Sequence, residues 1–361
     1  MFAIWSVTSF LLEVPSGAWA DVVDRRLLLV LSAPIYAAGF ATWILWPTYA
    51  GFAVGFVLWG LSGALLSGTF EALLYDLLSA VDATEAYAGL LGWANTAALA
   101  ATLAATAFAA PLHAWAGYAA VGWVSVGVAL IHGVLAWSLP PAPKIEEADE
   151  TKGFDGGATF FRRYVDMLRG GVHEATPRAP VCNLLVIAAA LYGLTAYDEY
   201  FPLVAGEVGA STDEAALLVA LTVAGQLAGS AVAGHLASLS RRGMTTIVAS
   251  SGVLIAAGAL AGHPLGFVAI AAGYGLMESA TIVAEAKLQD VISGPARATV
   301  TSLSGLVSEV GAVAVFATIA AGASWLAVST LLAIVTLPAL GIAAAVRSWW
   351  PGPTRVGGLR Q

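Results

Sequence analysis

The stretch 243–262, GMTTIVASSGVLIAAGALAG, decides the fold class, because it runs for its whole length without a charged side chain. A helix of about 20 apolar residues is long enough to cross the hydrocarbon core of a bilayer. The apolar residues do not alternate with polar ones in the two-residue pattern of a membrane barrel strand. A helix satisfies all of its backbone hydrogen bonds internally in lipid, so the stretch predicts a transmembrane helix.

Ten further stretches of the same kind surround this one. They cover 1–20, 27–47, 50–78, 88–111, 115–138, 178–204, 213–236, 264–284, 298–321 and 324–346. The composition agrees, since 59% of the 361 residues are apolar and 11% are charged, whereas a soluble domain carries about 25% charged residues. The chain is therefore predicted to be an all-α membrane protein with eleven transmembrane helices, embedded in a lipid bilayer.

Several other classes of protein are excluded or disfavoured. The net charge is -8 and no part of the chain forms a basic domain, so nucleic-acid binding is disfavoured. No two of the five histidines have the spacing of metal ligands, so no metal site is predicted. An intramembrane enzyme is disfavoured, because the sequence contains no HExxH, GxSxG or phosphate-binding loop.

The basic residues predict the orientation of the chain in the membrane. All 15 Lys and Arg lie in alternate loops, at 25–26, 144–178, 241–242, 287–297 and 347–360. No Lys or Arg occurs in the intervening loops, around 48–49, 112–114, 205–212, 263 and 322–323. The positive-inside rule then predicts a multi-pass protein of the cell membrane whose central loop and C-terminus are cytoplasmic.

A polar stretch divides the chain into two predicted bundles. It covers 139–177, opens with several prolines and an acidic run, and is predicted to be a cytoplasmic linker with a short interfacial helix. Before it lies a five-helix bundle (1–138). After it come a six-helix bundle (178–347) and a cytoplasmic tail (348–361).

Two motifs recur on both sides of this linker at nearly the same offset. GAWAD at 17–21, before Arg25 and Arg26, corresponds to GHLAS at 234–238, before Arg241 and Arg242. EALLYD at 71–76 corresponds to EAKLQD at 285–290. The repetition predicts a duplicated helix bundle, an arrangement found in a large class of secondary transporters.

Four motifs resemble those of the major facilitator superfamily, in order along the chain. LEVPSG at 12–17, with Asp21, Arg25 and Arg26, resembles the loop signature between that family's second and third helices. SGTFEALLYD at 67–76, DEY at 198–200 and RATVTSL at 297–303 resemble the fourth, seventh and eleventh helices of a prokaryotic branch. The resemblance implies a monomeric two-bundle permease that moves a small solute by alternating access, in one form as proton-coupled efflux, without a cofactor.

The sequence also departs from the family's pattern. The loop signature has Asp24 where the family usually has glycine, and the helix at 178–204 has no counterpart in the first bundle. Eleven helices are thus seen of an expected twelve, and we expect a further apolar stretch of about 20–30 residues to be encoded upstream of Met1. The alternative is a membrane protein that does not transport, such as a sensor or an assembly partner.

The residues with possible chemistry are carboxylates within the apolar stretches. A charge at the bilayer centre costs about 2.5–3.5 kcal/mol, so such groups usually face a cavity or a partner. The candidates for transport or proton coupling are Glu71, Asp198, Glu199, Glu278 and Glu309. The family resemblance implies that the helices of the first four line the central cavity. Each of the five is alternatively a structural acid, hydrogen-bonded to a neighbouring helix.

Further candidates accompany these carboxylates. Asn95, Tyr200 and Gln226 are polar residues that could contact a solute, and Asn95 and Gln226 are alternatively hydrogen-bonding links between helices. Pro202 is expected to end or bend its helix just beyond Asp198 and Glu199.

The loop signature itself consists of Gly17, Asp21, Arg25 and Arg26. The resemblance implies that Asp21 reaches the start of the helix near residue 298 and acts as a latch there.

Overall fold

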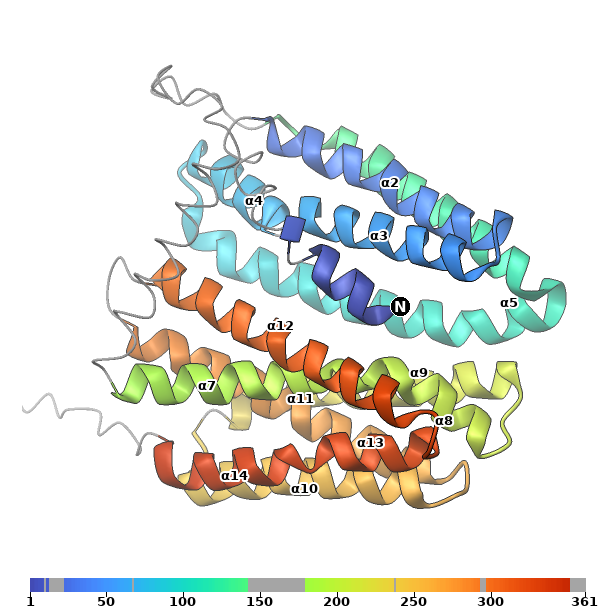
Figure 1. Cartoon of the computed structure of the whole chain (residues 1–361). Helices are drawn as coiled ribbons and strands as arrows, with labels where there is room; N and C mark the ends of the chain where they lie inside the picture. The colour runs from blue at the N-terminus through green and yellow to red at the C-terminus, as the bar shows by residue number, and fades with distance from the viewer. Residues whose placement is uncertain are drawn as a thin grey trace, which may run out of the picture. The chain divides into compact units, whose positions relative to one another are not determined.

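The computed structural model describes residues 1–9, 11–12, 23–66, 68–141, 179–236, 238–292 and 297–350. Throughout these ranges the chain consists of helices joined by short connections, and it contains no strand (Figure 1). Nine helical stretches of the described residues are long and apolar enough to cross a membrane. The prediction of an all-α membrane protein is confirmed.

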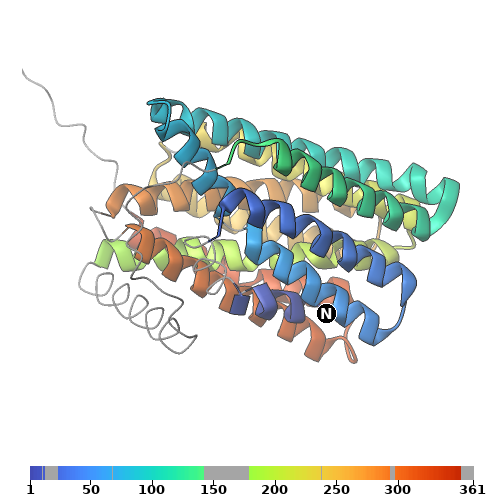
Figure 2. The same cartoon turned by 90° about the horizontal axis from the view of Figure 1, so that it is seen from above.

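The chain divides into two compact units, of which the first comprises residues 1–101 and 111–166. A short helix over residues 2–9 begins this unit. It continues with α2 (Arg25–Leu45), α3 (Tyr49–Leu66), α4 (Thr69–Ser79), the short η1 (Thr84–Ala86) and most of α5 (Tyr87–Ser138). Helices α2 and α3 lie side by side in both views (Figures 1 and 2). Ser62 of α3 donates a buried hydrogen bond of 3.0 Å to the carbonyl oxygen of Ser32, which ties the pair together.

Helix α5 is in fact two helices joined at a reversal of the chain, which is visible in Figure 2. Gly117 interrupts it with a φ of 70°, a left-handed conformation that glycine adopts without steric penalty. The predicted spans 88–111 and 115–138 correspond to the two arms. The predicted span 1–20 is described only in part, so the total of eleven helices remains a prediction.

The second unit comprises residues 102–110 and 167–361. Its helices are α7 (Ala179–Leu194), η2 (Thr195–Tyr200), α8 (Phe201–Glu207), α9 (Thr212–Leu236), α10 (Arg241–Leu260), α11 (Gly266–Val291), α12 (Arg297–Gly322), α13 (Val328–Thr336) and α14 (Pro338–Trp349). Helix α11 packs against α7, α9 and α10. Fully buried Phe267, Ile270 and Met277 lie on it, so α11 is the central helix of this unit.

Helices α9 and α11 cross with their backbones almost in contact. A Cβ atom added to Gly225 would lie 2.2 Å from the carbonyl oxygen of Ala271, and one added to Gly229 would lie 2.0 Å from that of Gly275. Ser279 closes the crossing by donating a 2.9 Å hydrogen bond to the carbonyl oxygen of Gly229. Small residues at a four-residue spacing permit this approach, which maximises packing where lipid offers no hydrophobic driving force.

Two of the predicted spans contain an irregular stretch, and both irregularities have the same cause. The span 178–204 divides into α7, the 3-10 segment η2 and α8, while the span 324–346 divides into α13 and α14. Pro202 and Pro338 each lie in the first turn of the helix after the break. Proline has no N–H and its ring clashes with the carbonyl four residues earlier, so the irregular backbone falls before the proline. Pro202 therefore interrupts the helix at η2, which carries Asp198 and Glu199, and not just beyond these two residues.

Candidate functional site

Four side chains of the second unit form a polar row along one face of α11. The hydroxyl of Tyr274 donates a 2.6 Å hydrogen bond to Oδ2 of Asp198 on η2. Glu278 lies four residues further along α11, hence one turn away on the same face. The amide of Gln226 on α9 donates to Oε2 of Glu278 at 3.3 Å. We call Asp198, Gln226, Tyr274 and Glu278 the α11 polar face.

The local backbone explains why these groups meet. Gln226 lies between Gly225 and Gly229, so the close crossing of α9 and α11 brings its amide within reach of Glu278. Asp198 lies on the 3-10 segment η2, where the amide of Phe201 donates to the carbonyl oxygen of Asp198 three residues earlier. A 3-10 turn within a longer helix is a frequent feature of functional hinges.

Aromatic rings surround the Tyr274 end of the α11 polar face. The ring centroids of Tyr197 and Phe201 lie 6.1 Å and 5.5 Å from that of Tyr274, both in edge-on arrangements. Tyr197 is 0% exposed, and within the described residues its hydroxyl has no hydrogen-bond partner. Leaving a buried hydroxyl unpaired is unfavourable. We therefore expect the Tyr197 hydroxyl to have a hydrogen-bond partner other than a described residue.

The other predicted residues occupy different places. Glu199 and Tyr200 are half-buried on η2, and the ring of Tyr200 lies 6.2 Å from that of Phe316 on α12. Glu309 is half-buried on α12. Of the candidates in the second unit, the structure thus pairs Gln226 with Glu278, while Asp198 pairs with Tyr274 one turn away on α11.

The two candidates in the first unit lie on separate helices. Glu71 is half-buried in the first turn of α4, and Asn95 is exposed on α5. In the part of the chain that is described, no three His, Cys, Asp or Glu side chains lie close enough together to hold a metal ion.

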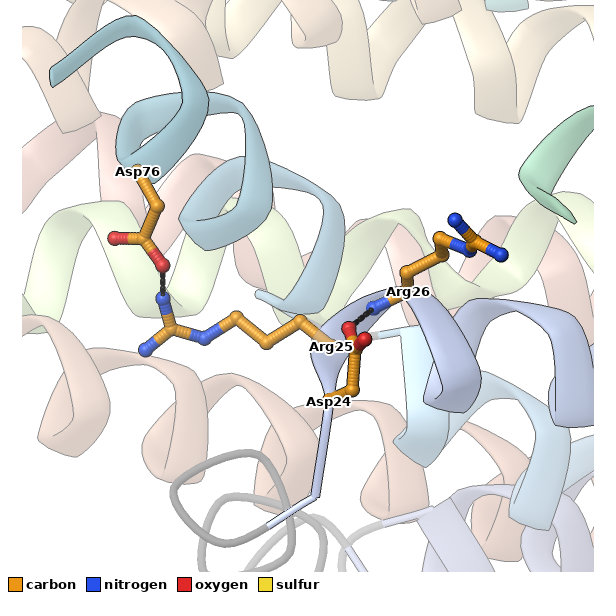
Figure 3. A network of polar contacts seen from close by, with 4 residues as sticks. All are labelled: Asp24, Arg25, Arg26 and Asp76. Carbon is orange, nitrogen blue, oxygen red and sulfur yellow. Dashed lines mark hydrogen bonds and ion pairs between the residues drawn. The ribbon is translucent and has the colours of Figure 1, made fainter. Parts of the chain in front are cut away.

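A second polar network lies in the first unit, at the start of α2 (Figure 3). Arg25 forms an ion pair with Asp76 on α4. The carboxylate of Asp24 accepts a 2.9 Å hydrogen bond from the backbone N–H of Arg26 and so caps α2. Aspartate is among the best residues at this helix position, which accounts for the departure from the family's glycine. Gly17 and Asp21 lie outside the described residues, so the latch remains a prediction.

In each unit, an arginine side chain donates a hydrogen bond to a carbonyl oxygen at the end of the last helix. Arg26 donates to the carbonyl oxygen of Leu139, directly after α5, at 3.1 Å, and its guanidinium lies 4.5 Å from the ring centre of Trp137. Arg241 donates to the carbonyl oxygen of Trp350, directly after α14, at 3.0 Å. Both arginines belong to the repeated motif, and each satisfies a carbonyl that the helix end leaves free. Arg26 is the second arginine of its copy of the motif and Arg241 the first, so the two contacts are similar but are not made by corresponding residues.

Sequence reasoning missed three features of the second unit. Tyr274 lies in an apolar run that offers no signal of its role. The pair Gly225 and Gly229 has the four-residue spacing of a helix-packing motif and could have been found. The carboxylate of Glu207 accepts from the backbone N–H groups of Val328 and Ser329 at 2.6 Å and 2.9 Å, which caps α13 from α8; no local pattern announces such a long-range contact.

Similarity to known proteins is found among solved structures. No protein-family model and no curated protein matches the chain. Among solved structures, the E. coli fucose:proton symporter is similar at 16% identity with a TM-score of 0.56, and the match covers 96% of this chain and 89% of the symporter. A D-xylose-proton symporter is similar at 15% identity with a TM-score of 0.69, covering 98% and 87%.

A nucleoside transporter is similar at 12% identity with a TM-score of 0.65, and the match covers 97% of this chain and 90% of that one. Each match spans nearly the whole chain. The sequence similarity is low, so the comparison concerns the fold. The chain therefore has the fold of these transporters, in agreement with the resemblance seen in its sequence motifs.

Proposed function

We propose that the chain is a secondary active transporter that exports a small solute in exchange for protons by alternating access. The proposed orientation places the basic loops in the cytoplasm. The fold supports this proposal, because it is similar to the folds of three transporters, of which two are described as proton symporters. These neighbours are transporters rather than enzymes, which agrees with the lack of catalytic motifs in the sequence.

The observation that carries the proposal is the hydrogen bond from Tyr274 to Asp198. It joins the irregular segment η2 to the central helix α11. An ionised carboxylate accepts a stronger hydrogen bond than a protonated one. Loading a proton on Asp198 therefore weakens the link between the two elements, and this couples a proton to a movement of the η2 segment. Broken helices that carry polar groups form the binding and coupling sites of many transporters.

Proton movement in reconstituted vesicles tests this proposal. Liposomes that contain the purified chain and an internal pH-sensitive dye are supplied with candidate solutes under an imposed pH gradient. We expect solute-dependent proton flux, in the direction of exchange, that Asp198→Asn abolishes. Asp213→Asn, which removes a carboxylate from the first turn of α9, is the matched control and should retain the flux.

Two results would contradict the proposal. Gradient-driven transport that survives both Asp198→Asn and Glu199→Gln would show that η2 does not carry the coupling site. A folded chain that moves no solute and no protons across a broad panel would favour the non-transporting alternative.

A further inference from the structure

The charge balance within the membrane-spanning helices points to the kind of solute. All 15 Lys and Arg of the sequence lie at 25–26, 144–178, 241–242, 287–297 and 347–360, in the loops or near helix ends. Glu278, in contrast, lies about 18 Å along α11 from Gly266, near the middle of a bilayer about 30 Å thick. Among the described residues of the second unit, carboxylates lie within the helices, whereas the basic residues lie near helix ends.

The contacts of the two carboxylates on the α11 polar face are with neutral groups. Asp198 accepts from the hydroxyl of Tyr274, and Glu278 accepts from the amide of Gln226. The ion pairs of Arg25 with Asp76 and of Lys287 with Asp290 involve other acids. Neutral donors orient a carboxylate but leave its charge in place, and an uncompensated charge away from water is unfavourable.

The hydroxyl of Tyr197 is a second, independent observation that points to a bound ligand. It is buried and, within the described residues, unpaired. Tyr197 directly precedes Asp198, and its ring packs against that of Tyr274, so it adjoins the α11 polar face. A ligand with N–H donors would satisfy this oxygen, and the faces of the tyrosine rings attract a positive charge.

We propose that the α11 polar face, together with Tyr197, binds an organic cation that carries N–H donors, namely an amine or a guanidinium on an apolar body. The inference rests on the proposed function, because it names the class of solute. Two carboxylates and a tyrosine oxygen accept the N–H groups, and the buried rings of Tyr197, Phe201 and Tyr274 lie beside them. A metal ion fits less well, since no three acidic or imidazole side chains of the described residues converge.

Binding of three probes that share a phenyl group and carry a positive, a neutral or a negative polar end tests the inference. The purified full chain in detergent is titrated with 2-phenylethylammonium, 2-phenylethanol and phenylacetate, and affinity is read by calorimetry. We expect the ammonium alone to bind. Glu278→Gln should weaken its binding about tenfold or more, because a charge-assisted hydrogen bond is lost. Asp290→Asn removes a charge from an exposed position on the same helix and should leave the affinity unchanged.

Tyr197→Phe separates a ligand contact from a structural role. Removing a buried hydroxyl that lacks a partner in the described residues should leave the melting temperature of the ligand-free chain unchanged or raise it. The affinity for 2-phenylethylammonium should fall several-fold. Equal binding of 2-phenylethanol, or undiminished ammonium binding by a folded Glu278→Gln variant, would overturn the inference.

The failure of this inference can be told apart from failure of the proposed function. Proton-coupled transport of a neutral or anionic solute, with no binding of the ammonium, overturns the organic-cation site and leaves the transporter intact. Charge-selective ammonium binding by a chain that moves neither solute nor protons supports the site and overturns the transport proposal.

Discussion

Tyr274 donates its hydroxyl to Asp198 at 2.6 Å, so the central helix of the second unit holds the carboxylate of the irregular segment η2. Neighbouring Tyr197 has a hydroxyl without such a partner in the described residues. The two tyrosines are of the same size, are both buried and have rings in contact. They therefore form a matched pair for measuring what one interhelical hydrogen bond contributes.

We expect Tyr274→Phe to lower the free energy of unfolding by about 0.5–2 kcal/mol, the range for hydrogen bonds between membrane helices. Tyr197→Phe should leave it unchanged or raise it, because no protein hydrogen bond is lost and an unpaired buried hydroxyl is removed. Unfolding in mixed micelles with increasing denaturing detergent measures both. Equal losses in the two variants would show that the Tyr274 contact adds nothing to the packing of the ring.

The glycine crossing gives a second prediction. The Cβ of Gly229→Ala would lie 2.0 Å from the carbonyl oxygen of Gly275, so α9 and α11 must separate. Forcing an extra methyl group into a packed contact costs about 1–3 kcal/mol. Gly234→Ala, on the same helix but facing open space, should be neutral or stabilising. The melting temperatures of the two variants in detergent compare them, and a neutral Gly229→Ala would mean that the crossing is not tightly packed.

The pair Arg25 and Asp76 should show a measurable coupling energy. Both side chains are partly buried, with 25% and 23% of their surfaces exposed. A double-mutant cycle with Arg25→Gln and Asp76→Asn should give about 1 kcal/mol. Lys287 and Asp290 form the comparison pair, since the aspartate side chain is 70% exposed, and their coupling should be close to zero. Similar values for the two pairs would argue against a special role of the Arg25 contact.

Glu207 is expected to stabilise the first turn of α13. Its two carboxylate oxygens each accept one backbone N–H, from Val328 and Ser329. Glu207→Gln leaves one acceptor oxygen and should cost about 1 kcal/mol, with faster hydrogen exchange at those two amides. Asp213→Asn is the control for loss of a nearby negative charge. Unchanged exchange in Glu207→Gln would show that other groups hold this helix end.

Labelling of single cysteines tests the predicted orientation. In a Cys182→Ala background, Trp325→Cys lies before α13 and Ser348→Cys lies at the end of α14, so they mark the two ends of one helical pair. The positive-inside rule predicts that a membrane-impermeant maleimide labels position 325 in intact cells, and position 348 only after permeabilisation. The reverse pattern would overturn the proposed topology.

Local features of the sequence predicted the all-α membrane fold. Apolar runs of bilayer length, basic residues confined to alternate loops, and two repeated motifs are all visible without coordinates. These signals are reliable because lipid forces each segment to satisfy its own backbone hydrogen bonds. The breaks at Pro202 and Pro338 follow from the same local chemistry, although their position before each proline was not foreseen.

The pairing of side chains was decided only by the tertiary structure. Asp198, Gln226 and Glu278 are candidates from sequence because they are polar residues in apolar stretches. No local pattern predicts that Tyr274 is the partner of Asp198, because the two residues are 76 positions apart. The partner of Glu278 depends on how closely α9 approaches α11, which the glycines on both helices permit together. Insertion into lipid is a property of each helix alone, whereas a site between helices depends on the distance and rotation of both.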